Sequence, residues 1–362
     1  MTLFPQLPTP TILVDRTKVA RNIRELQAAC DAAGVELRPH IKTHKMVEVA
    51  RQQLDAGAKG LTCAKLGEAE AMLPSGVRSI FLAHSLVDPG QAPRVRALAE
   101  QLADFRVGLS SEAQLDPLAR LAAAAGKKLS VMLAVDTGLH REGTRDPAAA
   151  QRIAARLARH PHLELVGFYT HEGHLYGVPP DQQPAGVAAL LDQLCAVRDS
   201  IDPGLVVWPG SSVSARWIAL AGAGRIQAVR PGAYVFGDLS LAETTRVMPA
   251  ASVALEILAT VVDRPEPGLA LIDAGSKTFS SDRTAAGIFG KACDGRELTV
   301  TRVNEEHGYV TGPGVGSLAV GDRVRFMPAH VCTVVNLTDE VTVTDGDQLV
   351  GSWRVDARGK VR

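Results

Sequence analysis

The period of the hydrophobic pattern changes repeatedly along the first two thirds of the chain, and this alternation predicts an α/β fold. Apolar residues recur every three or four positions, as one buried helix face requires, in residues 18–33, 46–56, 66–74, 92–102, 112–125, 147–160, 183–199 and 214–221. Short β-branched runs alternate with them at residues 36–41, 60–64, 79–83, 105–109, 129–135, 163–170, 205–208 and 226–229. Such alternation is typical of a closed (β/α)8 TIM-like barrel. An open doubly wound sheet is the second interpretation, because the pattern does not show closure.

The pattern changes again near residue 242, where helical spacing fades and Gly- and Asp-rich turns separate strand-like runs. These runs cover residues 253–262, 269–273, 298–303, 323–327, 333–337 and 341–344. The extended segment 10–14 is expected to join them. We therefore predict a barrel over residues 14–241 and a C-terminal β-domain over residues 242–362, joined by residues 1–13.

Composition and charge narrow the classes of function. With 46% hydrophobic residues, the 362-residue chain has the composition of a globular protein with large cores. Lys plus Arg equals Asp plus Glu, at 39 each, so no global field favours nucleic acid or an anionic membrane. The sequence shows neither a signal-peptide pattern nor an apolar run long enough for a membrane span. The five cysteines form no CxxC pair, which favours reduced thiols and a cytoplasmic protein.

A cluster of cationic and titratable side chains lies where the first predicted barrel strand ends. Residues 38–45 read RPHIKTHK, and the catalytic groups of a barrel gather at the C-terminal ends of its strands. Neighbouring positive charge and desolvation both favour a neutral amine at Lys42, the form that attacks a carbonyl. A solvated basic loop is the alternative interpretation.

Two glycine-containing turns after the seventh and eighth predicted strands are candidates for a phosphate site. Residues 209–213 (PGSSV) supply backbone N–H groups and two hydroxyls ahead of a predicted helix. Residues 230–234 (RPGAY) follow the next strand. Barrels often bind phosphate in these two loops. A tight turn without a ligand would explain either motif alone, whereas the pair favours a phosphate site.

Histidine spacing argues against one metal site and for another. His171-Glu-Gly-His174 is not the helical HExxH of a metalloprotease, because its histidines are three apart and flank a glycine. We interpret it as an active-site loop, with surface histidines as the alternative. His330 and Cys332 lie two apart in a predicted extended segment, so their side chains share one face and suit one borderline cation. Buried packing of both residues without a metal is the alternative here.

Together these segments resemble the D-threonine aldolase and D-serine dehydratase group of fold-type III (alanine racemase-like) pyridoxal-phosphate enzymes. The resemblance spans nearly the whole chain and depends on ordered motifs: RPHIKTHK, VDTGLHREG, FYTHEGHLYG, PGSSVSAR, RPGAYVFGD, LIDAGSKTFSSD, NEEHGYV and PAHVCTVVNL. It implies a homodimer that acts on a small D-amino acid with two cofactors, pyridoxal 5'-phosphate and a divalent metal (Mn, Mg, Co or Zn). It implies no nucleic-acid partner and no membrane partner.

The resemblance also implies roles for individual residues. Lys42 would carry the cofactor as a Schiff base, with Arg38 beside it and His307 on the substrate side. The metal pair would be His330 and Cys332. The remaining cofactor contacts would come from the strand-end pocket, the ring-facing arginine, the phosphate loop and a tyrosine near the phosphate: His40, Arg141, Gly210, Ser211, Ser212 and Tyr234. His171 lies where relatives carry another residue, so the resemblance assigns it no role.

Two reactions are compatible with these residues. In retro-aldol cleavage the metal acidifies the β-hydroxyl of a β-hydroxy-D-amino acid, and breaking Cα–Cβ gives glycine and an aldehyde. In dehydration, as in D-serine dehydratase, Lys42 removes the Cα proton and the hydroxyl leaves as water. Cys332 favours the dehydratase, whereas the compact length and the following VNL favour the aldolase, which we predict. Amino-acid racemisation is less well supported. Alanine racemases need a tyrosine of the β-domain as the base on the second face, and the only tyrosine beyond residue 234 is Tyr309.

Overall fold

The computed structural model describes residues 3–362, and its internal contacts divide the chain into two compact units. The barrel unit contains Arg24–Lys42, Val49–Gly232 and Lys360–Arg362; the β unit contains the N-terminal segment up to Ile23, Thr43–Glu48 and Ala233–Gly359. The border expected between residues 241 and 242 lies inside the β unit, because Leu239 packs against Val253 and Met327.

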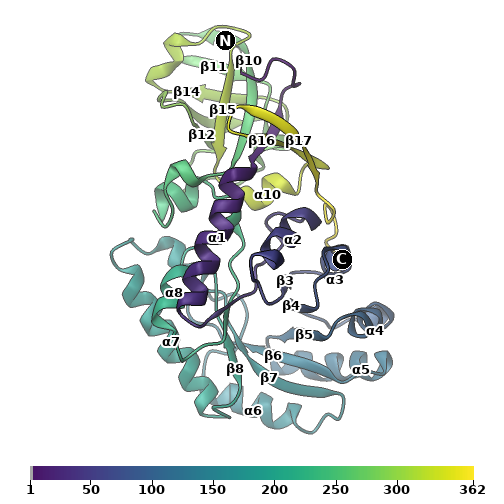
Figure 1. The fold of residues 1–362 in the computed structure, drawn as a ribbon. Coiled ribbons are helices and arrows are strands. Elements are labelled where there is room, and N and C mark those ends of the chain that lie inside the picture. Colours follow the sequence, from purple (N-terminus) through teal and green to yellow (C-terminus); the bar gives the residue numbers. More distant parts are fainter. Residues whose placement is uncertain (1–2) are drawn as a thin grey trace. The chain divides into compact units, whose positions relative to one another are not determined.

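Eight parallel strands within residues 3–362 form the barrel unit (Figure 1). Six make one sheet in the order β3 (Leu61–Cys63), β4 (Ser79–Ser85), β5 (Asp104–Leu109), β6 (Leu129–Ala134), β7 (Leu163–Tyr169) and β8 (Val206–Trp208). The other two, β2 (Glu36–Leu37) and β9 (Ala228–Val229), pair with each other. Closure follows from Thr62 N donating to Pro39 O (2.8 Å) and Gln227 N donating to Val207 O (3.2 Å). The predicted (β/α)8 TIM-like barrel is confirmed.

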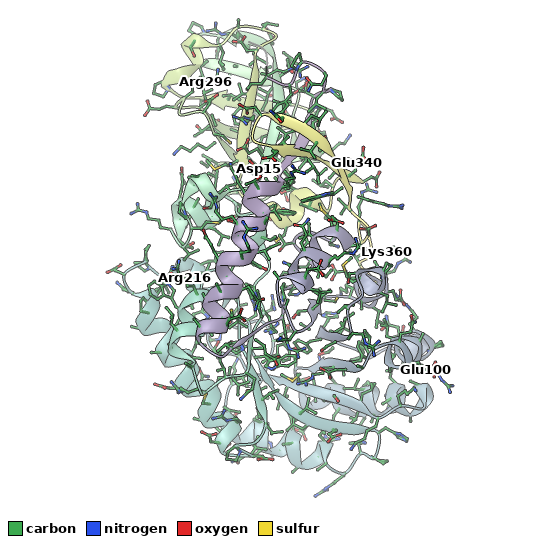
Figure 2. The ribbon with its side chains drawn as sticks, in the orientation of Figure 1. Asp15, Glu100, Arg216, Arg296, Glu340 and Lys360 are labelled. Carbon is green, nitrogen blue, oxygen red and sulfur yellow. The ribbon has the colours of Figure 1, made fainter. Side chains whose placement is uncertain are left out.

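Helices alternate with these strands, and side-chain caps set where several of them begin. The helices are α1 (Arg16–Ala32), α2 (Val47–Asp55), α3 (Leu66–Met72), α4 (Ala92–Gln101), α5 (Leu115–Ala125), α6 (Pro147–Leu157), α7 (Gln183–Asp199) and α8 (Ala215–Ala221). Asp15, labelled in Figure 2, accepts the amides of Thr17 (2.9 Å) and Lys18 (3.0 Å), so α1 begins earlier than the apolar spacing predicts. Within residues 3–362, no helix combines the length and apolarity needed to cross a membrane.

The interior of the barrel is filled by aromatic and cationic side chains. The ring of Phe81 contacts those of Tyr169 and Trp208 edge-on, at centroid distances of 5.0 Å and 5.8 Å. The guanidinium groups of Arg38 and Arg106 each lie 4.4 Å from the centre of the Trp208 ring. These cation–π contacts let buried cations share the interior with aromatic rings. The barrel is therefore a packed core, and its chemistry is left to the C-terminal ends of the strands.

The β unit contains a closed antiparallel barrel with an extension. Its barrel strands run in the order β11 (Leu269–Ile272), β14 (Gly308–Thr311), β13 (Thr299–Val303), β12 (Gly290–Ala292), β15 (Arg323–Pro328) and β10 (Leu255–Glu266), and a β10–β11 pairing closes the ring. The extension is β1 (Thr11–Asp15), β16 (Glu340–Asp345) and β17 (Gln348–Arg354). The predicted C-terminal β-domain is confirmed, and the N-terminal segment joins it because β1 pairs with β10.

One predicted strand, residues 333–337, is wrong. The chain leaves β15 at Pro328, passes an extended His330, and forms the short helix α10 (Val331–Val335). The run of β-branched residues has the composition of a strand, but Val331, Val334 and Val335 are buried at helical spacing. Tertiary burial of one helix face therefore overrides the local preference for a strand.

We predict that Trp208→Ala destabilises the protein by about 3–5 kcal/mol, because it empties the centre of the barrel core. Trp217→Ala is the matched control: Trp217 lies on α8 and is 39% exposed. Urea unfolding of both variants measures the difference. Equal unfolding midpoints for the two variants would show that the packing of Trp208 in the barrel core contributes no more to stability than the exposed Trp217.

Candidate active site

Lys42 is positioned by the backbone hydrogen bonds that close the barrel. The amide of His40 donates to Pro231 O (2.9 Å), the amide of Ile41 donates to Thr62 O (2.9 Å), and Ile41 is fully buried. The Lys42 amide lies 3.4 Å from His40 Nδ1. The short strand β2 and the residues after it are thus fixed on both sides, and Lys42 lies in the turn that follows.

His171 is the residue around which the charges of this barrel end gather. Burial, followed by the positive charges of Lys42, Arg141 and Arg230, lowers the pKa of His171 to about 3, although the amide of Gly210 acts in the opposite direction. The imidazole is therefore neutral at physiological pH. The resemblance assigned His171 no role, yet it brings Lys42, Arg141 and the glycine turn into one electrostatic environment.

The predicted phosphate loop lies at the C-terminal end of β8. Gly210 has φ +145°, and a Cβ atom there would lie 2.2 Å from the backbone nitrogen of Arg230. Only glycine fits this position. Ser211 is buried and its hydroxyl lies 3.0 Å from that of Ser214, whereas Ser212 accepts the amide of Gly232 at 3.2 Å. The two predicted turns, 209–213 and 230–234, are therefore hydrogen-bonded to each other.

A buried carboxylate and a buried guanidinium support this loop from below. Glu172 is fully buried; its carboxylate accepts the amide of Gly210 (3.2 Å) and the hydroxyl of Ser214. Arg230 donates to Trp208 O (2.9 Å) and Thr170 O (2.5 Å). Burial lowers the pKa of Arg230 to about 10, although the charge of Glu172 acts in the opposite direction. Arg230 therefore stays cationic near neutral pH and offsets the carboxylate beside an anion site.

Arg141 extends from a loop organised by Asp136. The Asp136 carboxylate accepts the amides of Gly138 and His140, each at 3.0 Å, and Arg145 Nε at 3.0 Å. Burial alone would raise the pKa of Asp136, but these hydrogen bonds lower it to about 2. Asp136 therefore stays ionised at neutral pH and holds the loop. Arg141, in this loop, lines one small cavity with His171.

Two further predicted residues lie in the β unit. Tyr234 is buried in the short 3-10 helix Ala233–Val235. His307 is exposed in the turn between β13 and β14, where its carbonyl accepts the amide of Asn304 at 2.8 Å. No hydrogen bond among the described residues joins the His307 side chain to His330 or Cys332, and its catalytic role stays a prediction.

The predicted metal pair comes together, although not by the geometry expected from an extended segment. His330 is the extended residue that begins α10, and Cys332 lies in the first turn of that helix. Cys332 nevertheless lies near enough to His330 to raise the pKa of its imidazole. His330 Nδ1 lies 2.7 Å from Asp282 Oδ2, so Nε2 is the ring nitrogen that this contact leaves available. No group of three or more His, Cys, Asp or Glu in residues 3–362 is arranged to hold a metal ion.

The surroundings of His330 make it cationic before any cation binds. Burial alone would lower its pKa. The hydrogen bond and charge of Cys332, the charge of Asp238 and the hydrogen bond to Asp282 together raise the pKa of His330 to about 10. On the other side of the pair, Thr43 Oγ1 lies 3.1 Å from Cys332 Sγ. Thr43 is the residue that follows Lys42 in the chain.

A parallel barrel with a lysine at the end of its first strand, followed by an antiparallel domain, defines the class: a fold-type III, alanine racemase-like enzyme fold. The alanine racemase N-terminal domain matches residues 14–240, and the putative serine dehydratase domain matches residues 254–344. The chain belongs to this family, and the predicted resemblance is confirmed. The family implies pyridoxal phosphate as cofactor.

Curated relatives narrow the group. D-threonine aldolase from Arthrobacter sp is 30% identical over 98% of this chain and 93% of its own length. D-threo-3-hydroxyaspartate dehydratase from Delftia sp. (strain HT23) is 32% identical over 96% of this chain and 97% of its own length. This pair includes one aldolase and one dehydratase, and both are lyases.

Solved structures agree. The crystal structure of D-threonine aldolase from Filomicrobium marinum superimposes with a TM-score of 0.88 at 25% identity, covering 100% of this chain and 98% of the other. A cysteine-to-alanine variant of a D-threo-3-hydroxyaspartate dehydratase, described as metal-free, gives a TM-score of 0.86 at 30% identity over 98% of both chains. A variant described under the same enzyme name replaces a histidine whose number is two lower than that of this cysteine.

Sequence reasoning missed the residues that support the site: Glu172, Asp238, Asp282 and the buried part played by Arg230. All four stand inside motifs already recognised. Glu172 lies between His171 and His174, Arg230 begins RPGAYVFGD, and Asp238 ends it. A buried position inside a functional motif was the available signal. Asp282 ends LIDAGSKTFSSD, but nothing in the sequence places it against a residue 48 positions later.

We predict that Gly210→Ala weakens pyridoxal-phosphate binding by about tenfold or more, because a Cβ would displace the loop at a cost of about 1–3 kcal/mol. Titrating the cofactor into apoprotein, followed by visible absorbance, measures the affinity. Gly224→Ala is the control: Gly224 also has a positive φ, but its Cβ would meet open space. If Gly210→Ala binds pyridoxal phosphate as tightly as the wild type, the prediction that this loop contacts the cofactor is wrong.

Proposed function

We propose that this chain is a pyridoxal-phosphate lyase that cleaves β-hydroxy-D-amino acids between Cα and Cβ, giving glycine and an aldehyde, with a divalent metal as second cofactor. The observation that carries the proposal is the closeness of Cys332 to His330, whose pKa it raises, in a chain of this family. A racemase has no use for such a pair, whereas a lyase needs a Lewis acid at the β-hydroxyl. Dehydration of the same substrates is the second candidate, favoured by Cys332.

The barrel residues fit pyridoxal phosphate. Lys42 would hold the cofactor, and Gly210 and Ser212 would hold its phosphate in a cradle that a Cβ would fill. Arg230 supplies buried positive charge, and Arg141 lines a cavity with His171. Neutral His171 provides hydrogen bonds without adding a charge that would repel the cationic neighbours.

The donor set of His330 and Cys332 fits a borderline cation such as Zn²⁺, Co²⁺ or Mn²⁺. The carboxylate of Asp282 on Nδ1 directs the other ring nitrogen toward a metal, the usual arrangement at metal-binding histidines. Two protein ligands leave coordination positions for water and substrate. An open coordination sphere is typical of a catalytic metal.

When bound, pyridoxal phosphate supplies an electron sink at Cα, and the metal supplies a Lewis acid at the β-hydroxyl. The chain has to hold both and to move one proton. Lys42 Nζ would hold the cofactor and, once substrate is bound, could carry a proton in the turn that follows β2. Cleavage requires loss of the hydroxyl proton, and dehydration requires loss of the Cα proton, so the placement of the base decides the product.

The wider assignment follows the family. We propose a small D-amino acid substrate, a homodimer and a cytoplasmic location. None of the five cysteines, all within residues 3–362, forms a disulfide, as expected in a reducing compartment. His307 is proposed as a second catalytic residue on the motif that precedes β14.

The decisive experiment is product analysis of the holoenzyme with D-threonine and Mn²⁺. We expect glycine and acetaldehyde; 2-oxobutanoate would instead establish the dehydratase. Chelation and Lys42→Arg should each stop turnover, because one removes the Lewis acid and the other keeps the charge without the reactive amine. Lys45→Arg, in the same loop, is the control and should remain active. Turnover that survives chelation would overturn the metal-dependent mechanism.

We predict that metal affinity rises with pH. Because the pKa of His330 is raised to about 10, a cation must displace a proton at neutral pH. As long as the pH is below that pKa, each unit of increase in pH raises the fraction of neutral imidazole tenfold. The affinity for Co²⁺ should therefore rise about tenfold per unit between roughly pH 7 and 9. Calorimetric titration of Co²⁺ into protein that a chelator has stripped of metal, in buffers of different ionisation enthalpy, measures both affinity and proton release. Affinity independent of pH would contradict a protonated His330.

A further inference from the structure

A carboxylate from a distant segment lies behind the imidazole of His330 in the β unit. Asp282 Oδ2 lies 2.7 Å from His330 Nδ1 and 3.1 Å from Thr333 Oγ1. The Asp282 amide donates to Ser280 Oγ (3.2 Å), and this hydroxyl lies 2.9 Å from Thr333 Oγ1. Carboxylate, two hydroxyls and ring therefore form one connected network within the β unit.

The backbone that leads to Asp282 adopts an unusual conformation. Ser280, which follows the short helix α9 (Ser276–Phe279), has φ +68° and ψ −170°. Almost only glycine occupies this region, and another residue there costs about 1–3 kcal/mol. Ser280 is buried, and its amide donates to Ser276 O at 2.9 Å. A serine occupies a position that glycine would adopt more easily, and its hydroxyl is a member of the network that holds Asp282.

A second carboxylate has a different task. Asp238, also buried, accepts the amides of Val331 (3.1 Å) and Leu241 (3.0 Å). It therefore fixes the backbone at the start of α10, whereas Asp282 contacts the imidazole itself. Of the two, only Asp282 can choose which ring nitrogen carries a proton.

We propose that Asp282 is the positioning residue of the metal pair. By accepting the Nδ1 proton it fixes the tautomer and rotamer of His330, directs Nε2 at the cation and increases its basicity. The inference rests on the proposed function, which supplies the cation. Loss of such a partner typically weakens metal binding about 10–100-fold while both ligands remain.

The test is a titration of Co²⁺ into cofactor-loaded enzyme from which a chelator has removed metal. A thiolate bound to Co²⁺ gives a charge-transfer absorbance, so the readout reports the metal ligand and not activity. Asp282→Ala should keep this band at saturation and bind Co²⁺ about 10–100-fold more weakly. Asp282→Asn, which keeps a neutral acceptor for Nδ1, should fall between. Asp294→Ala is the matched control, since Asp294 is a partly exposed β-unit carboxylate that bonds to Arg296, labelled in Figure 2.

The outcomes separate this inference from the proposed function. Wild-type affinity in Asp282→Ala, or loss of the band at saturation, overturns the positioning role. If wild-type protein gives no band, or Cys332→Ala keeps it, the metal pair itself is wrong and the proposed function fails. If Asp282→Ala does not fold, Asp282→Asn decides, because an affinity equal to that of Asp294→Ala would then overturn the inference.

Discussion

The hydrogen bonds that close the barrel are the constraint on which the rest of the site depends. β2 has two paired residues, yet it is joined to β9 on one side and to the segment around Thr62 on the other. A two-residue strand with a partner on one side only would fray. Partners on both sides make the backbone before Lys42 rigid, so the lysine stands at a fixed point among the loops of the other strands. A reactive group of this kind gains from a rigid element under it.

Electrostatics at this barrel end follow from burial more than from net charge. Lys42, Arg141 and Arg230 are cations in a chain of zero formal charge, and they act on His171 because the surroundings are poorly solvated. Glu172 prevents the cluster from being purely cationic. The result is a local positive field for an anionic cofactor and a histidine that stays neutral. Neither property is visible in the overall composition.

The sequence was sufficient for the architecture, and it supplied the residues whose chemistry is proposed. Helical and strand periodicity predicted the eight barrel strands, because buried faces impose a period on the chain. It failed at residues 333–337, where burial of Val331, Val334 and Val335 selects a helix for a strand-like composition. It did not supply Asp282 or Glu172, although both stand inside recognised motifs, because nothing local shows which distant residue a supporting carboxylate contacts. Its place depends on contacts between segments far apart in the chain.

The error at α10 leaves the metal pair a prediction that can still be made, and the reason is physical. Two residues apart, His330 and Cys332 were expected to share a strand face. They lie instead on either side of a helix start, where an extended residue and a first-turn residue also converge. Such a junction does not orient an imidazole by itself, so the orientation has to come from other segments: Asp238 on the backbone, Asp282 on the ring and Thr43 on the thiol. Because Lys42 and Thr43 share a peptide bond, the lysine proposed to hold the cofactor is covalently adjacent to a residue that contacts the thiol of the proposed metal pair. Aldol cleavage and dehydration would use the same residues to hold the two cofactors. They differ in whether the hydroxyl proton or the Cα proton is removed, so residues that position the metal ligands serve both reactions. The choice between them belongs to whichever base reaches Cα or the hydroxyl first.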